Sequence, residues 1–188
     1  MASGFATLYR INSGIKDLTD SIYILVLADT HVATLELLPQ RLRQLIKDAD
    51  YVVHCGDFTE LRVVEELRSL AKHFIGVYGN TDSPEVKELL PAEAFIEIHG
   101  KKIAITHPYF GGPPWRLEEE LVESYPAADV ILFGHTHDAC SIRKNGVLLF
   151  NPGQGYSMFI LRASVGILKM TAGSVEGRIC PVDSAVLF

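Results

Sequence analysis

Residues 22–31 read IYILVLADTH, an apolar run that ends at Asp29 and is followed two positions later by His31. An unbroken apolar run of this length is typical of a strand buried on both faces, as in a parallel sheet covered by helices. Asp29 and His31 would then lie at the strand end, where open α/β sheets bind their ligands. Carboxylates and imidazoles both ligate metals. Taken alone, the pair is also compatible with a helix N-cap beside a surface histidine.

The composition favours a folded globular protein. The chain has 188 residues, of which 48% are hydrophobic, enough for a sizeable core. Its 17 basic and 23 acidic residues give a net charge of −6, which disfavours a general nucleic-acid binder. Cys55, Cys140 and Cys180 are too widely spaced for a zinc-type pair or a disulfide framework, so a reducing cytoplasm is the favoured compartment.

We predict a single domain over residues 22–180, preceded by an extension (1–21) and followed by a tail (181–188). Residues 1–21 lack the basic flank and apolar core of a signal peptide. No segment approaches the roughly 20 apolar residues of a membrane span, so no membrane partner is expected.

Strand and helix patterns alternate in the first half of the chain. Apolar spacing predicts helices over Thr34–Lys47 and Glu60–Lys72. Short apolar runs predict strands over Ile22–Ala28, Tyr51–Cys55 and His73–Tyr78. Strand–loop–helix units in succession predict a parallel, right-handed βαβ arrangement.

The pattern changes in the second half. Phe95–Ile98 and Lys102–Thr106 are predicted to form a hairpin, followed by a helix over Trp115–Ser124 and a buried strand over Asp129–Phe133. The remaining short segments are expected to form a mostly antiparallel meander: Ala139–Arg143, Val147–Phe150, Met158–Leu161, Val165–Met170 and Val175–Ile179. The simplest α/β architecture is two packed sheets with helices on their outer faces.

Potential metal ligands follow the ends of the apolar strands. They are Asp29, His31, Asp57, Asn80, His107, His135 and His137. This set is too large for one Zn²⁺ or Mg²⁺, but it suits two metals about 3.5–4 Å apart that share a carboxylate. Nitrogen and oxygen donors without thiolate fit Mn, Fe, Zn, Co or Ni and disfavour Ca²⁺. Each residue alone has a plainer interpretation, such as a cap at Asp57 or a left-handed turn at Asn80.

Glycine precedes three of these groups, at Gly56, Gly79 and Gly134. We expect it to let the backbone turn tightly, so that the following side chain faces the crevice.

The segments ADTHV, HCGDF, YGNTD, THP and FGHTH resemble the five motif blocks of the calcineurin-like metallophosphoesterases, in particular the YfcE-type small phosphodiesterases. The resemblance covers roughly residues 22–170. It implies a four-layer α/β-β/α sandwich of two mixed sheets flanked by helices. It also implies two metal sites, one held by Asp29, His31 and His137 and the other by Asn80, His107 and His135, with Asp57 bridging them.

The predicted function is a metal-dependent phosphodiesterase that hydrolyses small or activated phosphodiesters through a dinuclear-metal-bound hydroxide. Asp57, Asn80 and His135 are the predicted catalytic residues. Manganese is the first choice of metal, with nickel, iron, cobalt and zinc as alternatives. No specific nucleic-acid partner is expected, and self-association stays open.

The alternative is a scaffold similar to the retromer subunit of this fold, with weak or no catalysis. A nuclease of the same superfamily fits the negative charge of the chain less well.

Three residues depart from the pattern of the family. Thr81 replaces a histidine that in many members helps to protonate the leaving group, so aryl diesters should be hydrolysed far better than alkyl ones. Pro108 stands where the family usually has glycine, and Gln154 follows Asn-Pro-Gly where serine is common. We expect the loop of Gln154 to lie outside direct metal contact.

Several further residues have two interpretations. The loop Tyr109–Trp115 and Arg116 either contact substrate or form a hydrophobic staple for the next helix. His54 is expected to be a hydrogen-bonded core imidazole, whereas His73 and His99 are expected at the surface.

Overall fold

The computed structural model describes residues 7–9, 21–108, 116–157 and 162–185. The predicted strand Met158–Leu161 and the loop Tyr109–Trp115 lie outside these residues.

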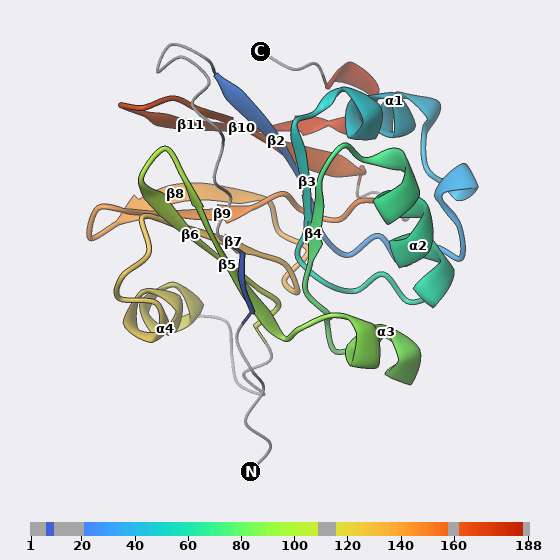
Figure 1. Ribbon diagram of the computed structural model, residues 1–188, viewed down its shortest axis with the longest axis horizontal. Coiled ribbons are helices and arrows are strands. Elements are labelled where there is room, and N and C mark those ends of the chain that lie inside the picture. The colour runs from blue at the N-terminus through green and yellow to red at the C-terminus, as the bar shows by residue number, and fades with distance from the viewer. Residues whose placement is uncertain (1–6, 10–20, 109–115, 158–161, 186–188) are drawn as a thin grey trace.

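Two mixed sheets form the centre of the molecule (Figure 1). In spatial order, the six-stranded sheet contains β1 (Thr7–Tyr9), β5 (Glu93–Ile98), β6 (Lys101–Thr106), β7 (Val130–Phe133), β9 (Val147–Asn151) and β8 (Cys140–Lys144). The five-stranded sheet contains β11 (Val175–Pro181), β10 (Ser164–Met170), β2 (Ile22–Leu27), β3 (Tyr51–His54) and β4 (Phe74–Gly76).

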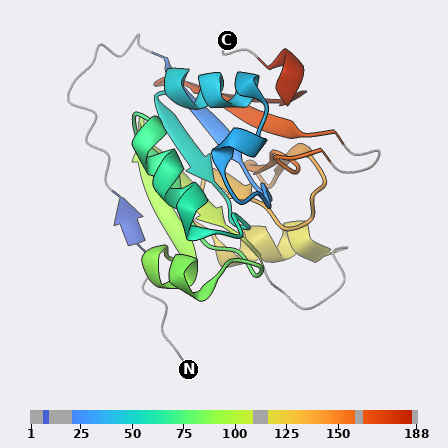
Figure 2. The same ribbon diagram turned by 90° about the vertical axis from the view of Figure 1, so that its right-hand side faces the viewer.

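Helices cover the outer face of each sheet. They are α1 (Gln40–Asp48), α2 (Leu61–Leu70), α3 (Pro84–Leu89) and α4 (Leu117–Ser124), with 3₁₀ turns η1 (Leu35–Leu37) and η3 (Val182–Ser184). In Figure 2, α1 and α2 lie across the five-stranded sheet, whereas α4 covers the other sheet. The predicted four-layer α/β-β/α sandwich is therefore confirmed.

Strand β2 shows how the sequence builds these layers. Its side chains alternate between the two faces: Leu25 and Leu27 pack against the helices, while Ile24 and Val26 face the second sheet. All four are fully buried. The unbroken apolar run is thus explained by burial on both faces.

Two predicted segments differ from the observed elements. The helix expected over Thr34–Lys47 is divided into η1 and α1, because Pro39 at the N-cap of α1 fixes an extended backbone, with φ −52° and ψ 140°. Helix α3 was not predicted, although Ser83 caps it through Val86 N–H and Pro84 occupies its first turn.

Most strand pairs of the second half are antiparallel, as predicted, but the strands do not form one continuous meander. Strand β9 pairs in parallel with β7 inside the six-stranded sheet, and β8 pairs with β9 at the edge. The chain then crosses to the other sheet, where β10 and β11 pair antiparallel. This crossing places the loop after Asn151 beside the strand ends that carry the predicted ligands.

Segments outside the predicted domain also contact it. Strand β1, from within residues 1–21, pairs in parallel with β5, and Val182 of η3 packs into the helix-side core. The division into extension, domain and tail stays a prediction. Within the described residues, no helix has both the length and the apolar character needed to cross a membrane.

Candidate metal centre

The seven predicted ligands follow the carboxyl ends of five strands. Asp29 and His31 follow β2, Asp57 follows β3, Asn80 follows β4, His107 follows β6, and His135 and His137 follow β7. Strands β2, β3 and β4 are parallel neighbours, as are β6 and β7, so each set ends at one edge of its sheet. Contacts between the two edges bring all seven residues into one cluster.

The backbone is strained at most of these positions. Positive φ angles occur at Asp29 (49°), His31 (43°), Asp57 (61°), His135 (81°) and His137 (60°). Residues other than glycine adopt this region at a cost of about 1–3 kcal/mol, and such residues concentrate at functional sites. Five of the eight such residues in the described chain are predicted ligands, so the strain is concentrated in this cluster.

The three preceding glycines are required for two different reasons. Only Gly56 has a positive φ, at 93°. A Cβ at Gly79 would lie 2.1 Å from Asp57 Oδ1, and one at Gly134 would lie 2.8 Å from the Cys55 carbonyl oxygen. The predicted tight turn therefore applies to Gly56, whereas Gly79 and Gly134 leave room for close packing of the loops.

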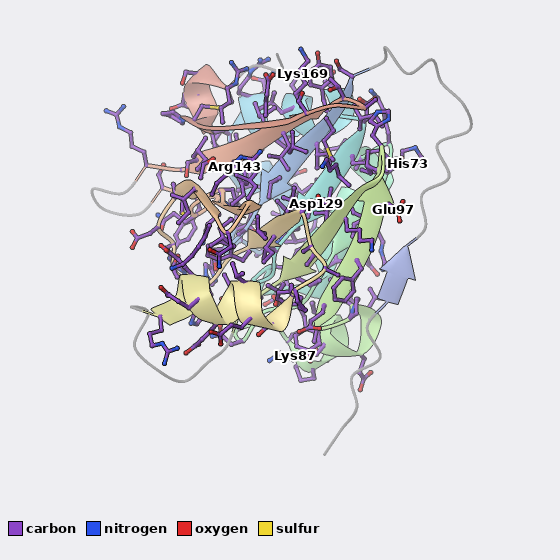
Figure 3. The ribbon with its side chains drawn as sticks, turned by 90° about the vertical axis from the view of Figure 1, so that its left-hand side faces the viewer. His73, Lys87, Glu97, Asp129, Arg143 and Lys169 are labelled. Carbon is purple, nitrogen blue, oxygen red and sulfur yellow. The ribbon has the colours of Figure 1, made fainter. Side chains whose placement is uncertain are left out.

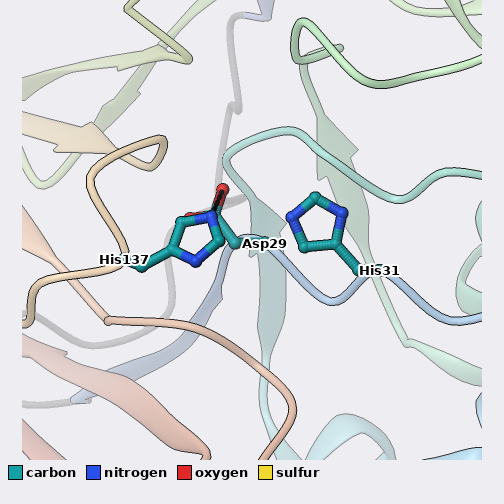
Figure 4. A group of neighbouring side chains, drawn as sticks. All are labelled: Asp29, His31 and His137. Atoms are coloured by element: carbon teal, nitrogen blue, oxygen red, sulfur yellow. Dashed lines mark ion pairs between the residues drawn. The ribbon is translucent and has the colours of Figure 1, made fainter. Parts of the chain in front are cut away.

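Asp29, His31 and His137 form the first ligand group (Figure 4). One donor atom from each side chain lies within 4.8 Å of the other two. His137 Nε2 lies 3.5 Å from Asp29 Oδ1, and the two imidazole ring centroids are 5.4 Å apart. Both oxygens of Asp29 also accept from the backbone N–H of His135, at 3.2 and 3.1 Å.

Asn80, His107 and His135, the second ligand group predicted from the sequence, also lie together. Asn80 Oδ1 lies 3.0 Å from His107 Nε2 and 2.9 Å from His135 Nδ1. The Cys55 carbonyl accepts from His107 Nδ1 at 2.7 Å, so a neutral His107 presents a lone pair on Nε2. In the observed amide orientation, two acceptors then face each other. A cation between them would satisfy both, so the donor set fits a bound metal.

Asp57 lies between the two groups. Its Oδ2 is 3.7 Å from His31 Nε2 and 3.5 Å from His107 Nε2. Its Oδ1 accepts from the backbone N–H of Thr81 at 2.9 Å, which fixes the carboxylate plane. This position suits the predicted bridging role.

Asp29, Asp57 and His107 are buried, whereas Asn80 is exposed and the other three imidazoles are partly buried. Burial, followed by the charge of Asp57, raises the pKa of Asp29 to about 8, although the His135 N–H opposes this shift. Burial also lowers the pKa values of His31 and His107. Two neighbouring carboxylates and neutral imidazoles therefore offer lone pairs that a divalent cation would satisfy.

Three buried side chains that were not predicted as ligands support the loops. Asp82 accepts from the backbone N–H groups of Asp57 (3.1 Å), Thr59 (2.7 Å) and Gly79 (2.7 Å). Asn151 donates to the Gly134 carbonyl and the Thr136 hydroxyl, and Gln154 contacts His137. The only sequence signal for Asp82 was its place in the YGNTD segment.

The burial of the remaining histidines mostly agrees with the sequence analysis. His54 is buried in the core, where its Nε2 lies 3.0 Å from the Thr30 hydroxyl and its ring stacks on Phe58. His73 is exposed (Figure 3), but His99 is only half-buried rather than fully at the surface. Arg116 is exposed, and nothing described joins it to the cluster.

Comparison with known proteins identifies the family. Residues 22–173 match the calcineurin-like phosphoesterase superfamily domain. A probable metallophosphoesterase of Methanocaldococcus jannaschii is 30% identical over 84% of this chain and 80% of its own.

Solved structures share the fold. An archaeal phosphodiesterase matches with a TM-score of 0.66 and 26% identity, over 85% of this chain and all 100% of that one. Vacuolar protein sorting 29 from Cryptosporidium parvum matches with a TM-score of 0.67 and 22% identity, over 85% and 97% of the two chains. As its motif blocks predicted, the chain belongs to the calcineurin-like phosphoesterase superfamily, with YfcE-type phosphodiesterases among its relatives.

Proposed function

We propose that this protein is a metal-dependent phosphodiesterase that acts on small or activated phosphodiesters. The observation that carries the proposal is the position of Asp57, whose Oδ2 faces His31 of one ligand group and His107 of the other. Relatives with phosphoesterase activity in their names support the same reaction class.

Each proposed metal has its own ligand group. Asp29, His31 and His137 would hold one divalent cation, and Asn80, His107 and His135 the other, with Asp57 shared. Two cations at this site would supply Lewis-acid activation of water and stabilise the charge on the phosphoryl oxygens. Manganese is our first choice, because mixed oxygen and imidazole donors without thiolate suit it.

The protein side chains hold and orient the reacting groups. Asn80 is exposed, so its amide is accessible to a phosphoryl oxygen, to which its NH₂ group can donate. Asp82 fixes the loops of Asp57 and Asn80 through three backbone N–H groups. Thr81 carries no group that titrates near neutral pH, so position 81 offers no general acid to the leaving group.

This lack of a general acid at position 81 defines the proposed substrate class. An aryl alcohol leaves readily without protonation, whereas an alkyl alcohol does not. We expect Mn²⁺-dependent hydrolysis of bis-p-nitrophenyl phosphate at a rate at least about 100-fold above that of a dialkyl phosphodiester. Comparable rates on both diesters would contradict the proposed leaving-group preference.

The enzyme proposal has its own test. Purified protein is analysed for bound metal, and hydrolysis of bis-p-nitrophenyl phosphate is measured with added Mn²⁺. His135→Ala and Asp57→Asn should each abolish most of the turnover. Full turnover in either variant would show that the proposed site does not carry the reaction.

A protein-interaction scaffold is the weaker alternative. The likeness to vacuolar protein sorting 29, at 22% identity, shows the fold alone. The complete set of seven metal-ligating side chains favours catalysis.

We also propose a reducing cytoplasmic location, because Cys55, Cys140 and Cys180 are all free thiols.

A further inference from the structure

Gln154 is a buried amide beside the first ligand group. It is only 1% exposed and lies in the loop after β9. Its Oε1 lies 3.1 Å from His137 Nδ1, and its Nε2 donates to the Tyr156 carbonyl at 2.9 Å. The side chain thus joins an imidazole of the site to the backbone of its own loop.

The bond to Tyr156 fixes the orientation of the amide. A backbone carbonyl only accepts hydrogen bonds, so the NH₂ group of Gln154 must face Tyr156. The opposite atom, which faces His137, is therefore the carbonyl oxygen. Because this oxygen also only accepts, the proton of a neutral His137 must be on Nδ1. Nε2 of His137 is then left with a free lone pair, 3.5 Å from Asp29 Oδ1.

We infer that Gln154 is a positioning residue that selects the metal-binding tautomer of His137. The inference rests on the proposed function, because it assigns His137 Nε2 to a divalent cation. Gln154 holds the ring orientation and the Nδ1–H tautomer before the metal arrives, as outer hydrogen-bond partners do for many histidine ligands. The loss of this bond leaves His137 free to rotate and to adopt the other tautomer.

His107 is held in the same tautomer as His137, but its hydrogen-bond partner is a backbone group rather than a side chain. Its Nδ1 donates to the backbone carbonyl of Cys55 at 2.7 Å, which selects the same tautomer. A side-chain substitution cannot remove that carbonyl. The tautomer of His137, in contrast, depends on a side chain that can be replaced, so it can be tested directly.

The first test reads the tautomer in metal-free protein. Long-range ¹⁵N–¹H NMR of histidine-labelled protein, at a pH above the ordinary histidine pKa of about 6.5, distinguishes Nδ1–H from Nε2–H. His137 should carry its proton on Nδ1 in the wild type and should populate Nε2–H in Gln154→Met. Gln154→Glu should retain Nδ1–H, since a carboxyl oxygen still accepts from it. A wild-type His137 with its proton on Nε2 would overturn the inference, whatever the variants do.

The second test measures metal affinity with Co²⁺, followed by its visible absorption. Gln154→Met should weaken Co²⁺ binding roughly 10- to 100-fold, and Gln154→Glu should restore most of this loss. Gln44→Met makes the same exchange on the exposed side of α1, where Gln44 contacts only Asp48 among the described hydrogen bonds, and should bind Co²⁺ like the wild type.

The two proposals fail in different ways. Unchanged Co²⁺ affinity and an unchanged His137 tautomer in Gln154→Met would overturn the role of Gln154 and leave the phosphodiesterase proposal intact. A wild-type protein that binds no Co²⁺ would contradict the metal centre itself.

Discussion

The carboxylate of Asp57 faces both proposed metal groups through a single oxygen. Asp57→Asn keeps the shape of the side chain but removes its charge and one anionic donor. We expect kcat/KM for bis-p-nitrophenyl phosphate with Mn²⁺ to fall by more than about 100-fold, beyond the 10- to 100-fold typical of an outer hydrogen-bond partner.

The matched control is Asp48→Asn. Asp48 is exposed at the end of α1, so this variant should retain wild-type activity. An equal loss in both variants would point to a general effect of charge removal rather than to the site.

Asp29 makes the stability of the metal-free protein depend on pH. Its pKa is raised to about 8 by burial and by Asp57, whereas an unfolded aspartate titrates near about 4. The folded state therefore binds one more proton between these values, and its stability falls as pH rises, by up to about 1.4 kcal/mol per unit. His31, His54 and His107, whose pKa values are lowered by burial, act in the opposite direction below about pH 6.5.

The fall in the stability of the metal-free protein should thus be visible between about pH 6.5 and 8, above the ordinary histidine pKa. Urea unfolding of metal-depleted protein would measure it, and Asp29→Asn should flatten the curve. Stability that rises across this window, or a fall that persists unchanged in Asp29→Asn, would contradict the assignment to Asp29.

At the scale of elements, β10 packs closely against β9 and β2. A Cβ at Gly166 of β10 would lie 2.2 Å from Phe150 Cε1 and 3.3 Å from Val26 Cβ. Gly166→Ala should lower the free energy of unfolding by about 1–3 kcal/mol, because the core must shift to admit the methyl group. Thermal unfolding measures this loss.

Gly173, in the turn between β10 and β11, provides the comparison. A Cβ there would meet no atom within 4 Å. Gly173→Ala should leave stability unchanged or raise it by up to about 1 kcal/mol, through reduced freedom of the unfolded chain. Equal destabilisation at both glycines would show that close packing is not the cause.

Periodicity predicted the elements well where burial is simple. β2, β3 and β7 were found because both faces of these strands are buried, so almost every residue is apolar. Pro39 interrupts a helical pattern that spacing alone continues. The parallel pairing of β9 with β7 was missed, because pairing partners are fixed by tertiary contacts and not by local pattern.

At the scale of the whole molecule, the candidate site forms where the carboxyl-end edges of the two sheets lie side by side. The clustering of the seven candidate ligands was predictable, because their residue types follow successive apolar strands. Their supporting contacts were not, since Gln154 and Asp82 act through bonds to segments 17 and 25 residues away, respectively. Nothing in a local pattern reports such partners.

The most direct test of the two-metal centre is anomalous diffraction from crystals grown with saturating Mn²⁺. We predict two manganese peaks: one beside Asp29, His31 and His137, the other beside Asn80, His107 and His135, with the Asp57 carboxylate between them. A map with a single peak, with no peak, or with Asp57 remote from both ions would contradict the two-metal centre.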